Sequence, residues 1–262
     1  MLLQAESIQQ FVEPCTHWVI INDPVVVLSE WETALSLYYT NHTLRLIAID
    51  QSSYSTWIGE AFKVSNNGWQ KQQLCKFLIY KSINDDYLIL DSKNFFVKPC
   101  NINEWESITG CGFLEIYTAK GDTWLPTIEA YSKYLNCPVN YTHLAMQTPF
   151  VFRKEILDKI DNFDIFLNWF NDQESLPSEF ILYSILTEKY QKLNRPMLSC
   201  AKHLTIWKKH NFEYFMQVSL SYSKDHIKVA GLHRGFLSEL TEIEQFKIQT
   251  WISNLGLRTQ LF

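Results

Sequence analysis

The chain has 262 residues, of which 47% are hydrophobic and 19% charged, and its formal net charge is -5. This length is enough to bury a substantial core, and we expect one large domain rather than two small ones. The charge balance lacks the basic excess that nucleic-acid binding usually needs, and no apolar run is long enough to cross a membrane. We therefore expect a folded protein with no nucleic-acid partner and no membrane span.

Cysteine usage bears on the compartment in which the protein works. The six cysteines include no Cys-x-x-Cys pair, so the sequence predicts neither a structural zinc site nor a redox motif. The amino-terminal residues lack the basic and apolar regions of a secretory signal. We interpret the cysteines as buried thiols and predict a cytoplasmic protein.

Helices and strands alternate in the first part of the chain. We expect a helix over residues 2–11, a strand over 17–21 that stops at Asn22-Asp23-Pro24, and a strand over 44–49 that ends in Asp50. Between the strands, a helix is predicted over residues 29–39, with Ser29 as N-cap and Glu32 completing a capping box. This alternation is typical of a parallel α/β sheet.

A further helix is predicted over residues 69–81, with Leu74, Phe77 and Leu78 on one side. The opposite side carries Trp69, Gln72, Gln73, Lys76 and Tyr80. This polar stripe fits either a solvated face or the border of a ligand crevice, to which Gln and Lys would offer hydrogen bonds and a positive charge.

The apolar run over residues 87–90 predicts a strand that is buried on both faces. It stops at Asp91-Ser92-Lys93-Asn94. Ligands bind in the crevice beyond the carboxyl ends of strands in an open parallel sheet, so this polar cluster is a candidate site. A strand-ending Asp is also a common turn former, and both interpretations stay open here.

The second half offers fewer chemical signals. Ser178 is the predicted N-cap of a helix that has Glu179 in its first turn, where an acid is favoured by the helix dipole alone. His143 and the His233-Arg234 pair fit either packing and surface roles or ligand contacts. Residues 162–174 predict a helix whose aromatic side chains belong to the core, and residues 241–255 predict a closing helix with Gly256 just beyond it.

Residues 68–99, GWQKQQLCKFLIYKSINDDYLILDSKNFFVKP, resemble the core of a group of small bacterial and viral GT-A-like glycosyltransferases. In that group, Gly-Trp and paired glutamines precede a strand that ends in a short acidic motif. Ser178-Glu179 and Gly231-Leu232-His233-Arg234 resemble two later motifs of the group, with Thr142-His143 and Phe152-Arg153 between them. The similarity extends from about residue 7 to residue 240.

The resemblance implies an α/β GT-A-like fold, which is a Rossmann-like mixed sheet flanked by helices with an appended acceptor lobe. Residues 1–100 would form the nucleotide-sugar half and residues 101–262 the acceptor half of a single domain. The chain would transfer a sugar from a nucleotide-sugar donor to a glycan, a lipid or another hydroxyl acceptor. GT-A chains normally open on a strand, whereas this sequence opens on the predicted helix, so we expect either that the opening strand is missing or that another element substitutes for it.

The resemblance also implies roles for individual residues. Asp91 would begin the DxD-type motif that holds Mn²⁺ or Mg²⁺, with His233 as a second ligand, but Lys93 stands at the third position and cannot bind a metal. Since an ammonium can itself neutralise a phosphate, a metal-independent site that uses Lys93 and Arg234 is an alternative. Glu179 would be the general base. The remaining donor or acceptor contacts would be Asn94, Trp69, Gln72, Gln73, Lys76 and His143.

Two other classes of protein remain open from the sequence. A degenerate, non-catalytic α/β module that binds a nucleotide or sugar would explain both Lys93 and the missing opening strand. A nucleotidyltransferase of related fold would need clustered carboxylates for two metal ions, and the motif offers one acid.

Overall fold

A computed structural model describes residues 1–21, 28–48, 68–101, 113–114, 124–138, 144–145, 148–162, 165–166, 169–170, 178–191, 203–206, 212–221 and 228–262. The helices are α1 (Leu2–Phe11), α2 (Leu28–Ser36), α4 (Gly68–Leu78), α5 (Tyr80–Ile83), α7 (Leu125–Leu135), α8 (Lys154–Leu157), α10 (Glu179–Gln191), α11 (Phe212–Ser221), α12 (Arg234–Ser238) and α13 (Glu242–Asn254). The strands are β1 (Thr16–Ile21), β2 (Thr43–Ala48), β3 (Tyr87–Ile89), β4 (Asn94–Phe96), β5 (Phe113–Leu114), β6 (Leu144–Ala145), β7 (Phe150–Phe152), β8 (His203–Ile206) and β9 (Val229–Leu232).

The strands form several small sheets of mixed direction. β1 pairs with β2 in parallel, whereas β3 pairs with β7 and β5 with β6 in antiparallel fashion. A three-stranded sheet has the order β4-β9-β8, antiparallel between β4 and β9 and parallel between β9 and β8. The fold is thus mixed α/β, as expected. The parallel pairing expected of the first strands holds for β1 and β2, whereas β3 pairs with the antiparallel strand β7.

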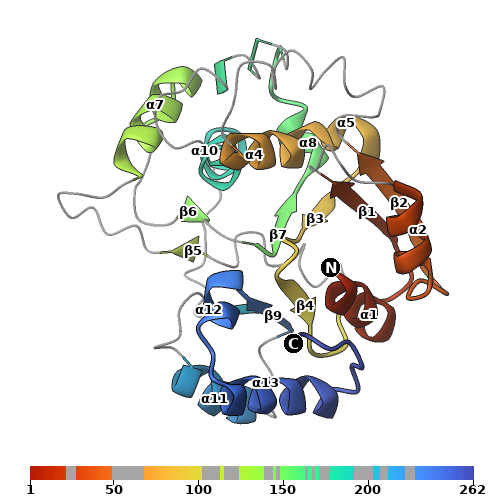
Figure 1. Ribbon diagram of the computed structural model, residues 1–262. Helices are drawn as coiled ribbons and strands as arrows, with labels where there is room; N and C mark the ends of the chain where they lie inside the picture. The colour runs from red at the N-terminus through yellow and green to blue at the C-terminus, as the bar shows by residue number, and fades with distance from the viewer. Residues whose placement is uncertain are drawn as a thin grey trace.

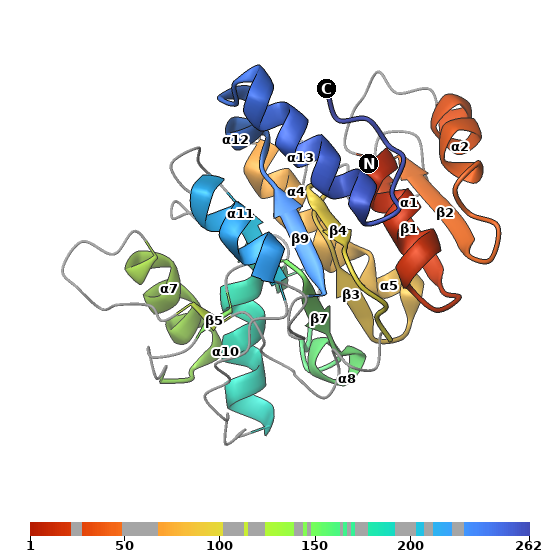
Figure 2. The ribbon, with the colours of Figure 1, turned by 90° about the horizontal axis from the view of Figure 1, so that it is seen from below.

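The elements lie in layers around β1, β2, β3 and β7. Figure 1 shows α4, α5 and α10 on one side of these strands and α1 on the other, and Figure 2 shows the same order from below. The second group of strands, β4 and β9, lies beside α11, α12 and α13. No helix among the described residues is both long and apolar enough to cross a membrane.

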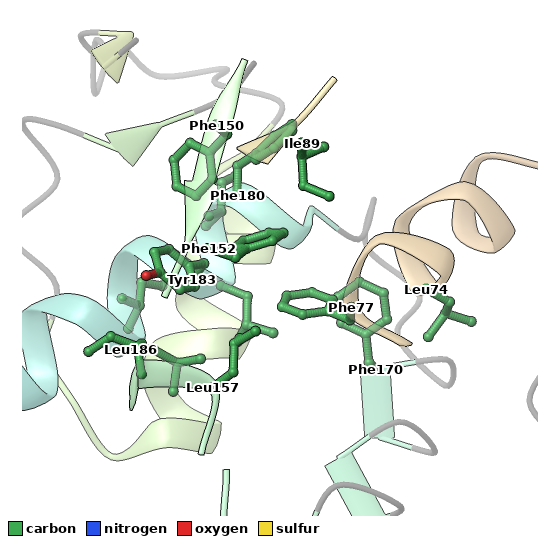
Figure 3. Packing of buried hydrophobic residues seen from close by; sticks show 14 of the residues in the cluster. Leu74, Phe77, Ile89, Phe150, Phe152, Leu157, Phe170, Phe180, Tyr183 and Leu186 are labelled. Carbon is green, nitrogen blue, oxygen red and sulfur yellow. The ribbon is translucent and has the colours of Figure 1, made fainter. Parts of the chain in front are cut away.

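The largest core cluster joins α4 and α10 to β3 and β7. Phe77 and Phe152 are completely buried, and their rings stack with centroids 5.4 Å apart. Phe166 and Phe170 are also completely buried, which confirms that these two aromatic residues belong to the core. Figure 3 shows Phe77, Phe152, Phe170 and Tyr183 meeting from different elements.

Most of the element ends that the sequence predicts agree with those of the structure. The predicted helix over residues 2–11 and strand over 17–21 correspond to α1 and β1. Thr241 and Glu244 form a capping box at the start of α13, and Gly256 beyond its end has φ +83°. The positive φ explains the glycine there, since other residues rarely adopt it.

Two of the expected local features are wrong. Ser29 lies inside α2 rather than at its N-cap, since the helix includes Leu28 and the Thr33 hydroxyl donates to the Ser29 carbonyl at 2.7 Å. The predicted helix over 69–81 is divided into α4 and α5 at Ile79. Asn22-Asp23-Pro24 and Asp50 lie outside the described residues.

The packing of the aromatic core predicts a large loss of stability for Phe152→Ala. The change would leave a cavity beside Phe77, Tyr87 and Tyr183, so we expect a cost of about 3–5 kcal/mol in the free energy of unfolding by urea denaturation. Phe246→Ala is the matched control, because Phe246 is 72% exposed and its loss should change that free energy by less than ~0.5 kcal/mol. Equal costs for the two variants would contradict this core.

Candidate functional site

The turn that follows β3 is closed by its own polar groups. The Asp91 N–H donates to Asn94 Oδ1 at 2.8 Å, and the Asn94 N–H donates to the Asp91 carbonyl at 2.9 Å. Gln4 of α1 donates from its side-chain nitrogen to the carbonyls of Asp91 and Asn94, each at 2.9 Å. Asn94 is fully buried, and its side chain holds the backbone of the turn through the contact with the Asp91 N–H.

A buried lysine links this turn to a distant helix. Lys76 Nζ lies 2.7 Å from Glu179 Oε1, to which it donates a hydrogen bond, and 2.9 Å from Asp91 Oδ1. The second Asp91 oxygen accepts a hydrogen bond from Lys93. Two ammonium groups and two carboxylates thus form one cluster, which we call the Lys76 cluster (Lys76, Asp91, Lys93 and Glu179).

The start of α10 fixes Glu179 in this cluster. Ser178 caps the helix, as predicted, with its hydroxyl accepting from the Ile181 N–H at 3.4 Å. The Ser178 N–H in turn donates to the buried hydroxyl of Tyr131 at 2.9 Å. Gln73 of α4 faces the Glu179 carboxylate and donates to it when its amide nitrogen is turned inward. Glu179 is 0% exposed, so its carboxylate is held by protein groups on all sides.

Burial and charge act in opposite directions on these groups. Burial raises the pKa of Asp91, but the charges of Lys76 and Lys93 more than offset it, and the pKa lies well below its usual range. Burial lowers the pKa of Lys76, yet Glu179 and Asp91 outweigh burial and raise it. For Glu179, burial wins over the attraction of Lys76, so its pKa is raised. Among these three groups, burial decides the direction of the pKa shift only for Glu179.

One side of the Lys76 cluster borders a cavity of about 790 Å³. Gln72 and Lys76 of α4 line it together with Asp91 and Ser92. The polar stripe of α4 therefore borders a crevice at these two residues, and the solvated-face interpretation is wrong for Lys76 and Gln73, which are buried. Glu179 is not among the residues that line this cavity.

The structure brings together only part of the predicted site. Asp91, Lys93, Asn94, Gln73, Lys76 and Glu179 lie in or directly against the Lys76 cluster. Gln72 is exposed at the cavity, and Trp69 belongs to α4, where its side chain is outside the described part. His143 lies outside the described residues.

His233 and Arg234 come directly after β9, which pairs with β4 next to the turn at residues 91–94. Asn94 pairs with Gly231 across β4 and β9, and the Leu232 N–H donates to the Lys93 carbonyl at 3.1 Å. His233 caps α12, with its Nδ1 accepting from the Gly235 N–H at 3.1 Å, and Arg234 is exposed. Neither residue lines the cavity beside Asp91. Their expected roles as metal or phosphate contacts therefore stay predictions.

The described side chains around Asp91 offer few ligands for a divalent cation. The Asp91 carboxylate is engaged by two ammonium groups, and within the described ranges no group of three His, Cys, Asp or Glu residues is arranged to bind a metal. These contacts do not support the predicted Asp91–His233 metal site, which stays a prediction, and we derive no step through a metal ion.

Sequence reasoning missed Gln4 and the phenol of Tyr131, which hold the two carboxylate-bearing backbones in place. Gln4 stands one turn before Ile8 on the buried side of α1. A polar residue among the apolar residues on the buried face of a predicted helix is the signal that could have indicated Gln4.

Comparison of the sequence with protein-family models and with curated proteins finds no match.

The Lys76 cluster predicts strong coupling between Lys76 and Glu179. In Lys76→Met, Glu179 keeps its burial but loses its nearest cation, and we expect a loss of about 3–5 kcal/mol in the free energy of unfolding at pH 7. Its carboxyl pKa would rise further above that of the unfolded chain, so the loss should shrink as the pH falls from 7 to 5 and the group takes up a proton.

The double variant Lys76→Met/Glu179→Gln completes the thermodynamic cycle, since it leaves no buried charge at either position. We expect it to be more stable than Lys76→Met alone in urea denaturation at pH 7. A double variant whose cost equals the sum of the two single costs would mean that the pair is not coupled.

Proposed function

We propose that the chain is a GT-A-like glycosyltransferase that transfers a sugar from a nucleotide-sugar donor to a hydroxyl acceptor. The supporting observation is the Lys76 cluster at the edge of the 790 Å³ cavity, directly after β3. This is the position at which the resemblance places the donor diphosphate. The cavity is of the size that small-molecule sites commonly have, roughly 300–1,000 Å³.

The chemistry of such a transfer rests on charge stabilisation. The departing nucleoside diphosphate gains negative charge as the glycosidic bond to the sugar breaks, and preorganised cations lower the free energy of that state. Lys76, which lines the cavity, and Lys93, which follows the lining residues Asp91 and Ser92, are the cations of the cluster, and their side chains are 10% and 15% exposed. On donor binding, we expect Lys93 to exchange its contact with Asp91 for one with a phosphate oxygen.

Glu179 has a different role in this proposal from the predicted one. A general base must reach the acceptor hydroxyl, whereas Glu179 is completely buried and hydrogen-bonded to Lys76. We therefore propose that Glu179 positions Lys76 and keeps its charge. The general-base role stays a prediction, and this geometry does not support it directly.

The second candidate is a non-catalytic nucleotide- or sugar-binding module. The observation that favours it is charge compensation, because each lysine of the cluster already contacts a carboxylate. Donor turnover separates the two candidates, since a module would bind the donor without releasing a nucleoside diphosphate.

Donor binding is expected to raise the melting temperature. At 100 times its dissociation constant, a nucleoside diphosphate or nucleotide sugar should stabilise the protein by about 2.7 kcal/mol. The measurement is a thermal shift against a panel of these ligands, with and without Mn²⁺. A shift that needs no Mn²⁺ would support the lysine-based site, and no shift with any ligand would contradict the proposal.

The same assay tests Lys93 directly. In Lys93→Ala, we expect donor affinity to fall by about tenfold or more, because a charge-assisted contact with phosphate is lost. Lys154→Ala is the matched control: Lys154 also pairs with an Asp, at 2.5 Å, but on the surface and not within the Lys76 cluster. Unchanged affinity in Lys93→Ala would remove this residue from the site.

Glu179→Gln distinguishes positioning from base catalysis. If Glu179 positions Lys76, donor affinity should fall in the variant, since the amide cannot hold the ammonium by charge. Retained affinity together with turnover reduced by roughly 10²–10⁴ would instead restore the general-base role. Calorimetric titration of the donor and single-turnover kinetics provide the two readouts.

A further inference from the structure

The 790 Å³ cavity has two long walls made by strand edges. Its lining includes every residue from 15 to 20, along β1, and every residue from 85 to 92, along β3. Successive side chains of a strand point to opposite faces of a sheet, so a pocket on one face would be lined by alternate residues. Consecutive lining therefore means that the cavity meets the backbone edges of both strands.

Both of these edges are open in the described part of the chain. β1 pairs with β2 on its other edge, and β3 pairs with β7 on its other edge. Within the described ranges no strand pairs with the edges that face the cavity. Such an edge presents a row of backbone N–H and C=O groups, which need partners when they are buried.

Helices cover the space between the two edges from both sides. On one side, a single helical stripe borders the cavity: Gln72, Cys75, Lys76, Ile79 and Ile83. On the other side, α1 contributes Met1 and Gln4, and its next turns line a smaller cavity of about 60 Å³ against the same two strands. Figure 1 shows β1 and β3 between α4–α5 and α1. The cavity thus occupies a position in the strand layer, between two helical layers.

We propose that this cavity is a strand-binding slot, which takes one extended apolar segment of a second polypeptide between β1 and β3. An extended strand is the ligand that carries hydrogen-bonding groups along both of its edges, as two facing strand edges require. About six residues, spanning roughly 20 Å, would match the part of β1 that borders the slot. The bound strand would complete a sheet in the order β2-β1-strand-β3-β7.

The lining specifies the side chains of the bound segment. Ile79 lines the slot from the helical layer on one side. On the other side, Ile8 of α1 and Val12, just beyond that helix, line the smaller cavity against the same strands. A strand covered on both faces reads as a continuous apolar run rather than an alternating one. The slot goes beyond the proposed sugar transfer, which uses the charged end of the cavity at Lys76, Asp91 and Ser92.

Hydrogen exchange with added peptide tests the slot. The probes are six-residue peptides of Val, Ile and Leu, flanked by Gly and Lys for solubility. We expect them to protect backbone amides in residues 16–20 and 87–90 together, and to leave those of α13 unchanged. The matched control is the same peptide N-methylated at alternate residues, which keeps the side chains but loses the donors of one edge. It should bind at least tenfold more weakly.

Thiol labelling gives a second readout in the same samples. Cys15 and Cys75 line the slot, so bound peptide should slow their reaction with N-ethylmaleimide, whereas Cys137 lies away from it and should react as before. Failure of every peptide to protect both strand segments would overturn the proposal. Equal binding of the N-methylated peptide would also overturn it, because the cavity would then be a general apolar pocket. Nucleotide is absent throughout, so these results are independent of the proposed transferase activity.

Discussion

The arrangement of this protein depends on one buried ammonium group. Lys76 is 8% exposed and lies between the carboxylates of Asp91 and Glu179, which come from the turn after β3 and the start of α10. A buried charge without a partner costs several kcal/mol, so the three segments must approach each other if Lys76 is to stay inside. The charged cluster thereby fixes where α4, β3 and α10 meet.

This constraint also decides which groups can reach a ligand. Glu179 is completely buried within the cluster, whereas Lys76 and Asp91 line the cavity and Lys93, next to the lining residue Ser92, is 15% exposed. The cavity then has two parts, a charged end at the cluster and the slot between β1 and β3, whose lining mixes apolar residues with Arg45, Asp85 and Asp86. A diphosphate suits the first part and an extended apolar strand the second.

Much of the local structure could be predicted because its causes are local. The capping pair Thr241 and Glu244, the N-cap Ser178 and the apolar strand before Asp91 are each set by neighbours within a few residues. The ion pair between Lys76 and Glu179 joins residues 103 apart in sequence, and no periodicity encodes such a contact. The antiparallel partner of β3 and the buried role of Gln4 were missed for the same reason, since both depend on segments far away in the chain.

The central claim is that the charged end of the cavity binds the diphosphate of a donor, and locating a bound nucleoside diphosphate by hydrogen exchange tests it most directly. The account predicts that saturating nucleoside diphosphate slows exchange at residues 72–76 and 91–94, and that Asp91→Asn alters this protection. Protection confined to other described segments, such as β8 or α13, would contradict the account, as would no protection at all.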